Sequence, residues 1–261
     1  MKFALIGCGN MGEVFLANIL STKIFSPEKI LVIEQPDKIK KIQKKYSVKT
    51  SADINQVKNS EIIFLAFKPQ NLSDIDLKIK NKIIISILAG TSVQTLNTKF
   101  PENKIIRAMP NIGQFVNQGM TGVFFPKNKN FSKQEKAQIL LIFEAGGKII
   151  ELKDENQIDD LTAISGSGPA YFFFFIEKLI DSAHKLGFSK EESTMLVKQT
   201  LFGATEIIKK NPKDEIKSWR KKVTSKGGTT EAALNILKNP EFEEFIFEAI
   251  YNAKQRAEFL K

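Results

Sequence analysis

Three glycines near the N-terminus have the spacing of a phosphate-binding turn. Gly7, Gly9 and Gly12 form a G-x-G-x-x-G motif between an apolar run at residues 2–6 and an amphipathic stretch at 11–20. In a strand–turn–helix frame the first glycine allows the tight turn, the second lets a pyrophosphate approach, and the third lets the helix lie close to the sheet. The helix N-terminus then offers N–H groups to the phosphates, although a glycine-rich turn without ligand is the alternative. The expected dinucleotide-binding residues are Ile6, Gly7, Cys8, Gly9, Asn10, Met11 and Gly12.

Glu34 follows the apolar run at 30–33, near the offset at which an acidic ribose ligand is expected. Its carboxylate can accept hydrogen bonds from the ribose hydroxyls of NADH, and it would repel the 2′-phosphate of NADPH. The alternative is a solvent-exposed charge at a strand end. Lys38 and Lys40 lie nearby in the sequence and can accommodate a phosphate. The cofactor is therefore expected to be NADPH or NADH, with the balance toward NADH.

Two later segments are expected at the same place as the glycine motif. They follow the apolar runs at 62–66 and 83–88, and ligands of open α/β sheets bind at the carboxyl ends of strands. Lys68 can contact cofactor phosphate or ribose, or it is a plain surface lysine. Small residues there leave space for a nicotinamide ring. The expected contacts are Ala66, Phe67, Lys68, Pro69 and Ala89.

The second half holds two glycine-rich segments, at 165–171 and 223–232, within helical patterns. Glycine is costly inside helices, so such segments suggest backbone amides that face something. The second segment leads into an expected helix at 231–237, and its hydroxyls and N–H groups can hold a carboxylate. Two plain interhelical turns are the alternative.

These residues need a frame that brings strand ends together. Apolar runs alternate with helical patterns at 11–20 and 37–46, which predicts a doubly wound parallel sheet of Rossmann type. After about residue 155 only helical patterns remain, at 170–186, 190–209 and 240–260. We therefore expect an α/β domain at 1–155 and an all-α domain at 156–261. The expected strands are 2–6, 30–33, 62–66, 83–88, 105–108, 122–125 and 148–152, with a helix at 133–144 before the last.

Four consecutive phenylalanines, Phe172 to Phe175, make one helix apolar around its whole circumference. Such a helix is buried on several sides, either in a core or under a second subunit.

Composition sets the class of protein. The chain has 261 residues, a net charge of +10 and one cysteine, so no intrachain disulfide can form and a reducing, cytoplasmic setting is expected. No apolar stretch is long enough for a membrane span. The lysines are scattered along helix faces, so neither a nucleic-acid role nor a metal site is expected.

Seven segments together resemble the pyrroline-5-carboxylate reductase family, and they run through the whole chain in the family's order and spacing. They are IGCGNMG at 6–12, AFKPQ at 66–70, LAGTS at 88–92, RAMPNI at 107–112, NQGMTGV at 117–123, SGSGPAY at 165–171 and VTSKGGTTEAAL at 223–234.

The resemblance implies a fold, a reaction and a site. It implies a Rossmann domain, a helical domain that interlocks two subunits of a homodimer, and dimers that can assemble into a decameric ring. The implied reaction reduces 1-pyrroline-5-carboxylate to L-proline with NADPH or NADH. Thr230 matches the family threonine whose hydroxyl hydrogen-bonds the ring nitrogen. The implied substrate-binding residues are Ser225, Gly227, Gly228, Thr229 and Thr230.

Two residues depart from the family's pattern, and three other functions are alternatives to the one that the resemblance implies. Many family members have proline where Lys226 stands and an acidic residue where Lys221 stands, which puts substrate affinity in question rather than reaction type. One rival is a β-hydroxyacid dehydrogenase-like reductase with a catalytic lysine, for which Lys178 and Lys185 are candidates. The others are a non-catalytic NAD-binding regulator of the same fold and a nucleic-acid binder. The single histidine, His184, is expected to be structural.

Overall fold

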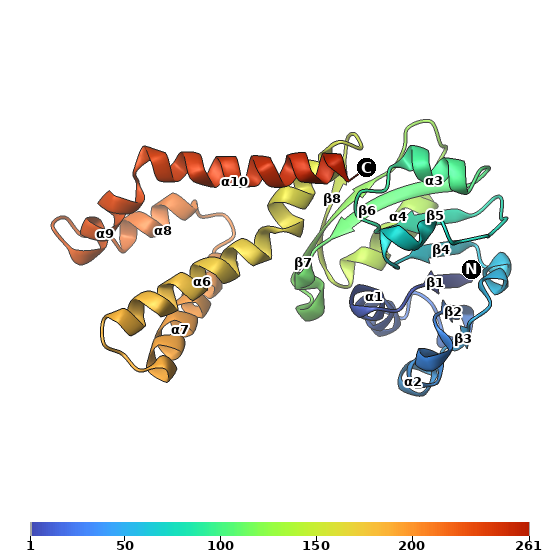
Figure 1. Ribbon diagram of the computed structural model, residues 1–261, viewed down its shortest axis with the longest axis horizontal. Coiled ribbons are helices and arrows are strands. Elements are labelled where there is room, and N and C mark those ends of the chain that lie inside the picture. The colour runs from blue at the N-terminus through green and yellow to red at the C-terminus, as the bar shows by residue number, and fades with distance from the viewer. Residues whose placement is uncertain (1, 261) are drawn as a thin grey trace. The chain divides into compact units, whose positions relative to one another are not determined.

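The computed structural model describes residues 2–260 (Figure 1). Within that range the contacts divide the chain into two compact units. Unit 1 comprises the chain up to Pro169 and again from Asn252, and unit 2 is Ala170–Tyr251. The single boundary expected near residue 155 concerns functional domains and stays a prediction. No helix in the described part is long and apolar enough to cross a membrane.

Unit 1 is built on one eight-stranded sheet with the order β3-β2-β1-β4-β5-β6-β7-β8. All neighbours are parallel except β6 and β7, which run antiparallel. The expectation of a doubly wound α/β sheet is confirmed. The structure adds one strand that the sequence did not predict, the polar edge strand β3. The strands are β1 (Phe3–Ile6), β2 (Ile30–Ile33), β3 (Lys49–Ser51), β4 (Ile62–Leu65), β5 (Ile83–Ser86), β6 (Lys104–Pro110), β7 (Gly119–Phe124) and β8 (Gly147–Leu152).

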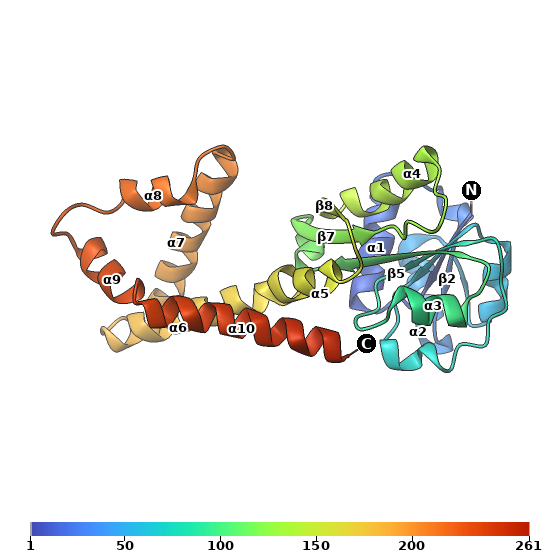
Figure 2. The ribbon, with the colours of Figure 1, turned by 90° about the horizontal axis from the view of Figure 1, so that it is seen from above.

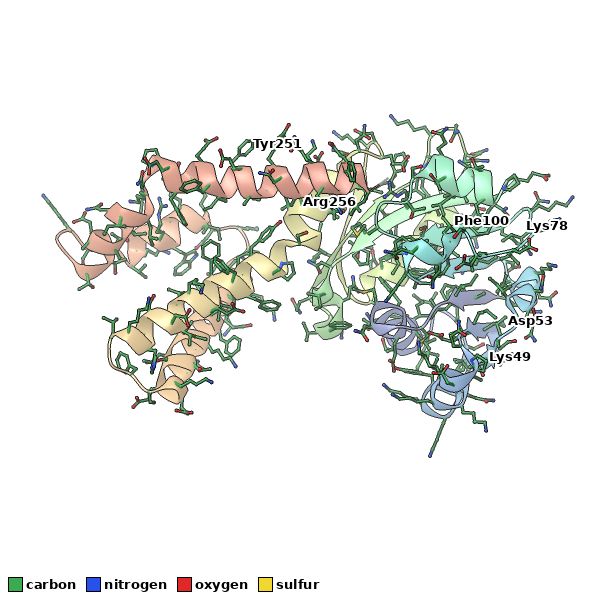
Figure 3. The ribbon with its side chains drawn as sticks, viewed as in Figure 1. Lys49, Asp53, Lys78, Phe100, Tyr251 and Arg256 are labelled. Carbon is green, nitrogen blue, oxygen red and sulfur yellow. The ribbon has the colours of Figure 1, made fainter. Side chains whose placement is uncertain are left out.

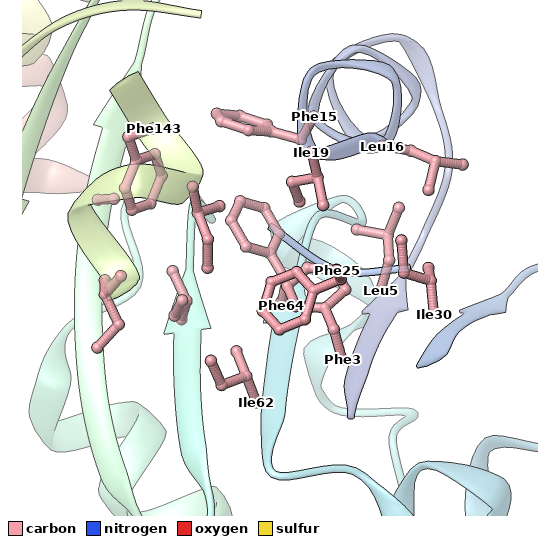
Figure 4. Packing of buried hydrophobic residues seen from close by; sticks show 14 of the residues in the cluster. Phe3, Leu5, Phe15, Leu16, Ile19, Phe25, Ile30, Ile62, Phe64 and Phe143 are labelled. Atoms are coloured by element: carbon pink, nitrogen blue, oxygen red, sulfur yellow. The ribbon is translucent and has the colours of Figure 1, made fainter. Parts of the chain in front are cut away.

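Strands β1, β2 and β4 are apolar at every position because both faces of the sheet are covered. Phe3 and Leu5 of β1 enter one core cluster, while Ala4 and Ile6 enter the cluster on the opposite face. In the first cluster the Phe64 ring lies between α1 and α4, with its centroid 4.9 Å from that of Phe15 and 5.9 Å from that of Phe143 (Figure 4). This packing fixes the start of α1, and with it the glycine loop, against the sheet.

Helices lie on both faces of the sheet, as Figure 2 shows. Residues of α1, α2 and α4 belong to the first core cluster and residues of α3 to the second. Helix α3 begins at a side-chain cap, since Ser92 Oγ accepts from the Thr95 N–H at 3.0 Å. The helices of unit 1 are α1 (Asn10–Ser21), α2 (Pro36–Tyr46), α3 (Val93–Lys99), α4 (Lys133–Glu144) and α5 (Gln157–Leu161), with short 3₁₀ turns at Pro27–Lys29, Ile54–Asn59, Pro69–Leu72 and Ile112–Val116.

Unit 2 is entirely helical and has almost no core of its own. Among residues 170–251 only Ser193 is buried. Each of the four phenylalanines at 172–175 is between 43% and 67% exposed, and the ring of Tyr251 projects away from its helix at 47% exposure (Figure 3). Its helices are α6 (Gly168–Lys185), α7 (Lys190–Lys210), α8 (Ile216–Lys222), α9 (Thr229–Leu237) and α10 (Pro240–Phe259), of which α6 starts and α10 ends in unit 1.

Candidate active site

The strand register brings the expected cofactor segments to one edge of the sheet. Ile6 pairs with Leu65, and Leu65 pairs with Ser86, so the segments that follow β1, β4 and β5 leave the sheet at the same level. Gly7 and Ala66 therefore lie side by side, and the Ala66 N–H donates to the Ile6 carbonyl at 2.9 Å. Ala89 is exposed beyond the end of β5.

A side chain would meet different surroundings at each of the three motif glycines. Gly7 has a φ of +87°, and a Cβ there would lie 2.9 Å from the Ala66 carbonyl. A Cβ on Gly12 would overlap the carbonyl oxygen of Gly7. At Gly9, in contrast, a Cβ would meet nothing within 4 Å. The loop is thus closed toward the sheet and open at Gly9, where a pyrophosphate is expected at the N-terminus of α1.

Glu34 joins this loop directly. Its Oε1 accepts from the Cys8 N–H at 3.2 Å and lies 3.2 Å from Lys38 Nζ, and its Oε2 accepts from the Gln35 N–H at 2.6 Å. The side chain is only 9% exposed. The alternative of a solvent-exposed strand-end charge is therefore wrong, because the carboxylate is enclosed and bonded to the motif itself.

Cys8 lies inside the loop but supplies no reactive group. The side chain is buried in the core cluster. Burial, followed by the nearby carboxylates of Glu13 and Glu34, raises the pKa of the Cys8 thiol to about 12. The thiol is neutral at physiological pH, and its backbone N–H is its contribution to the site.

The second glycine-rich segment of the sequence forms the loop before α9. Gly227 has a φ of +72°, and the Gly228 N–H donates to the Ser225 carbonyl at 3.1 Å. Gly228 is the N-cap of α9, where no side chain of the described residues caps the helix. The hydroxyls of Ser225, Thr229 and Thr230 have no partner within residues 2–260. The loop therefore presents amides and free hydroxyls that suit an anion.

Comparison with known proteins places this geometry in a family. A family model described as pyrroline-5-carboxylate reductase dimerisation matches residues 155–260, and one described as NADP oxidoreductase coenzyme F420-dependent matches residues 2–90. A pyrroline-5-carboxylate reductase of Synechocystis sp. is 37% identical, covering 100% of this chain and 98% of that protein. Pyrroline-5-carboxylate reductase 2 of Bacillus subtilis is 34% identical, with coverages of 100% and 95%.

The chain belongs to the pyrroline-5-carboxylate reductase family. Solved structures agree. A pyrroline-5-carboxylate reductase from Coxiella burnetii superimposes with a TM-score of 0.89 at 30% identity, covering 100% of this chain and 98% of that one. The Plasmodium falciparum pyrroline carboxylate reductase with NADP bound gives a TM-score of 0.82 at 30% identity, with the same coverages. These comparisons favour neither the β-hydroxyacid dehydrogenase-like reductase nor the non-catalytic regulator.

The sequence did not predict two features of this family member, a π-helical turn before α6 and the contacts of Asn111. The chain does not break at 165–171, because Thr162–Gly166 is a π-helical turn that continues into α6. Asn111, just after β6, donates through Nδ2 to the Ser165 carbonyl at 3.1 Å and accepts the Gly113 and Met120 N–H groups. Both the expected break and the alternative of a plain interhelical turn are therefore wrong here, and whether the segment contacts a ligand stays a prediction.

An ion pair between a buried arginine and a partly exposed glutamate lies in unit 1. Arg107 of β6 is 2% exposed at its side chain, and its Nη1 lies 2.8 Å from Glu155 Oε1. The same oxygen accepts the Val93 N–H at 2.7 Å and so fixes the start of α3. Sequence position gave no sign of this pair, because its partners are 48 residues apart.

Lys68 follows β4 at the carboxyl edge with the other expected cofactor segments, while a cavity and the single histidine have different positions. A cavity of about 490 Å³ lies at the opposite edge, before β4, β5 and β6, and is lined by lysines that include Lys78 (Figure 3). Lys68 is exposed after β4 and forms no ion pair among the described residues. His184 Nδ1 lies 2.9 Å from the Phe188 carbonyl oxygen at the end of α6, which is a structural position.

Proposed function

We propose that this protein reduces 1-pyrroline-5-carboxylate to L-proline with a reduced nicotinamide, the last step of proline biosynthesis. The main support is the full-length likeness, at 37% identity, to a protein with that reaction in its name. The loop before α9 adds chemical support, since the substrate is a carboxylate and the loop offers amides and hydroxyls.

The cofactor would be held at the carboxyl edge of the sheet in unit 1. A bound reduced nicotinamide supplies the hydride that reduces the C=N bond. The open space at Gly9 and the closed backbone at Gly7 and Gly12 fit a pyrophosphate on the N-terminus of α1. The proposed contacts are Ile6, Gly7, Cys8, Gly9, Asn10, Met11, Gly12, Glu34, Ala66, Phe67, Lys68, Pro69 and Ala89.

The substrate would be held by the loop before α9. Backbone N–H groups and hydroxyls of Ser225, Gly227, Gly228, Thr229 and Thr230 bind the carboxylate, and the Thr230 hydroxyl hydrogen-bonds the ring nitrogen. A cyclic imine is basic enough to be partly protonated near neutral pH, so a strong acid is not required. The residues act mainly by orienting the ring, and orientation can account for much of the barrier reduction.

Glu34 favours NADH over NADPH in this proposal. Its carboxylate already accepts the Cys8 N–H beside the phosphate loop. A 2′-phosphate would meet this enclosed negative charge, whereas ribose hydroxyls can donate to it.

The working form would be a homodimer in the cytoplasm, and dimers can assemble further into a decameric ring. The support is the match of residues 155–260 to a dimerisation model and the exposed apolar side chains of unit 2. In functional terms the chain then divides into a cofactor-binding part at 1–155 and a substrate-binding and dimerisation part at 156–261.

The decisive experiment mixes the purified protein with 1-pyrroline-5-carboxylate and follows the oxidation of NADH and NADPH separately. Oxidation that requires the pyrroline is expected, with NADH the faster cofactor. A folded preparation that oxidises neither cofactor would exclude the proposed reaction. Faster NADPH oxidation would leave the reaction standing and remove the role assigned to Glu34.

A further inference from the structure

The loop before α9 already contains a bound carboxylate, and it belongs to the chain itself. Glu231 Oε2 accepts the N–H of Gly227 at 2.7 Å. Gly227 is the residue with the left-handed backbone, at a φ of +72°. Its amide is one of those that the proposed function assigns to the carboxylate of the substrate.

A second helix of unit 2 shows how an ordinary cap differs. In α7 the third helical residue, Glu192, accepts the N–H of the N-cap Ser189 at 2.9 Å, and the Ser189 hydroxyl accepts the Glu192 N–H in return. In this reciprocal capping box both backbone N–H groups, that of Ser189 and that of Glu192, have a side-chain acceptor. In α9 the equivalent residue, Glu231, reaches past the N-cap Gly228 to Gly227, and no side chain returns the bond in the described residues.

The charges around the loop explain why a carboxylate settles there. Residues 216–230 contain five basic side chains and no acidic one, and Glu231 is the first acid that follows. The substrate carboxylate carries the same charge and needs the same donor. Because one N–H group cannot serve two carboxylates in full and like charges repel at contact distance, Glu231 and the substrate exclude each other there.

We propose that Glu231 is an internal competitor for the substrate carboxylate, holding the Gly227 amide in the free protein and releasing it when substrate binds. This inference rests on the proposed function. The apparent affinity for substrate is then reduced by the fraction of molecules in which Glu231 occupies the amide. Anions that contact the loop but make no ring contacts are excluded for the same reason, so Glu231 adds selectivity for a ring-bearing carboxylate.

The test compares the full-length wild type with Glu231→Gln and with Glu192→Gln, the matched control at the same helical position of α7. Isothermal titration measures the dissociation constants of L-proline and of L-prolinamide, which lacks the carboxylate. Glu231→Gln is expected to bind L-proline about three- to tenfold more tightly, because a neutral amide competes less well for the N–H than a carboxylate does. L-Prolinamide binding should not change, and Glu192→Gln should alter neither constant.

Each outcome decides the matter. Equal or weaker L-proline binding by Glu231→Gln, in a protein that reduces the pyrroline, makes Glu231 a helix cap only and overturns the competitor role while the proposed function stands. Tighter binding of both ligands also overturns it, because the gain would not depend on the carboxylate. No turnover together with no L-proline binding by either protein removes the proposed function, and the inference falls with it.

Discussion

Thr230 is the residue on which the proposed chemistry depends most. It is the second residue of α9, half-buried, and its hydroxyl has no partner within residues 2–260. Thr230→Val keeps the shape of the side chain and removes the hydroxyl. We expect kcat for pyrroline-5-carboxylate to fall about ten- to hundredfold, since a hydrogen bond to a charged group contributes roughly 1.5–3 kcal/mol.

The measurement is steady-state turnover at saturating substrate, with the KM for the nicotinamide as internal control. That KM should not change, because Thr230 lies in unit 2 and the expected cofactor residues lie in unit 1. Full turnover by Thr230→Val would show that the hydroxyl takes no part in the reaction.

At the residue scale, the proposed function assigns the cofactor preference to Glu34. Glu34→Ser removes the charge that opposes a 2′-phosphate and frees Lys38, which now lies 3.2 Å from the carboxylate. We expect kcat/KM for NADPH to rise about tenfold and that for NADH to fall severalfold, as one charge contact is worth about one factor of ten. The control is Asp37→Asn, which removes an exposed charge from the first turn of α2. It should change kcat/KM for neither cofactor. An unaltered ratio of the two constants in Glu34→Ser would contradict the assignment.

At the scale of elements, Glu135 ties the start of α4 to β6. Its carboxylate accepts the Ser132 N–H at 2.7 Å in a capping box and lies 2.6 Å from Lys104 Nζ. The hydrogen bond from Lys104, with a further bond from the Ser132 backbone, holds the pKa of Glu135 below its ordinary value of 4.5. A depressed folded-state pKa stabilises the protein above pH 4.5, and this contribution is lost as the pH falls through the folded value.

Glu135→Gln preserves the shape of the cap and removes the charge. At pH 7 we expect the free energy of unfolding to fall by about 1 kcal/mol, and near pH 3, where Glu135 is closer to protonation, the difference from the wild type should be smaller. Urea midpoints at the two pH values measure this, with the exposed Glu144→Gln as control. An equal loss at both pH values would mean that packing, not charge, carries the effect.

The sequence predicted elements well where one physical rule dominates. The inner strands are apolar runs buried on both faces and were foreseen, as was the largely exposed edge strand Gly147–Leu152, whereas the edge strand Lys49–Ser51 is polar and short. The helices Val93–Lys99 and Ile216–Lys222 span seven residues each, too few for a 3.6-residue period to stand out. The glycines at 166 and 168 were interpreted as a break because they are costly in α-helices, but Gly166 ends a π-helical turn and Gly168 is the first residue of α6.

The sequence predicted the motifs of the candidate site but not the hydrogen bonds that join residues far apart in the chain. The glycine loop and Glu34 are local patterns with known stereochemistry. The bond from Cys8 to Glu34 spans 26 residues and that from Asn111 to Ser165 spans 54, so only the folded chain reveals them. Glu231 was likewise a plain first-turn residue in the sequence, and its bond to Gly227 depends on the left-handed backbone of the loop.

At the scale of the whole molecule, unit 2 buries almost no apolar side chain within a single chain. Only Ser193 is buried among residues 170–251, and Phe172, Phe202 and Phe245 are each more than half exposed. Burial of apolar surface is the main favourable contribution to folding, and in the proposed homodimer a second copy of the chain would provide it. Folding of unit 2 and association of subunits are then one event.

This coupling makes stability depend on protein concentration. For a dimer that unfolds to monomers, each tenfold rise in concentration stabilises the folded state by about 1.4 kcal/mol, so the urea midpoint should rise with it. Phe173→Glu places a charge on the exposed face of α6 and should give a lower mass by sedimentation together with loss of helical signal. Lys78→Glu, at the far edge of unit 1, should change neither. A wild-type midpoint that is constant over a hundredfold range of concentration would mean that unit 2 folds without a partner, and the exposed phenylalanines would then need another explanation.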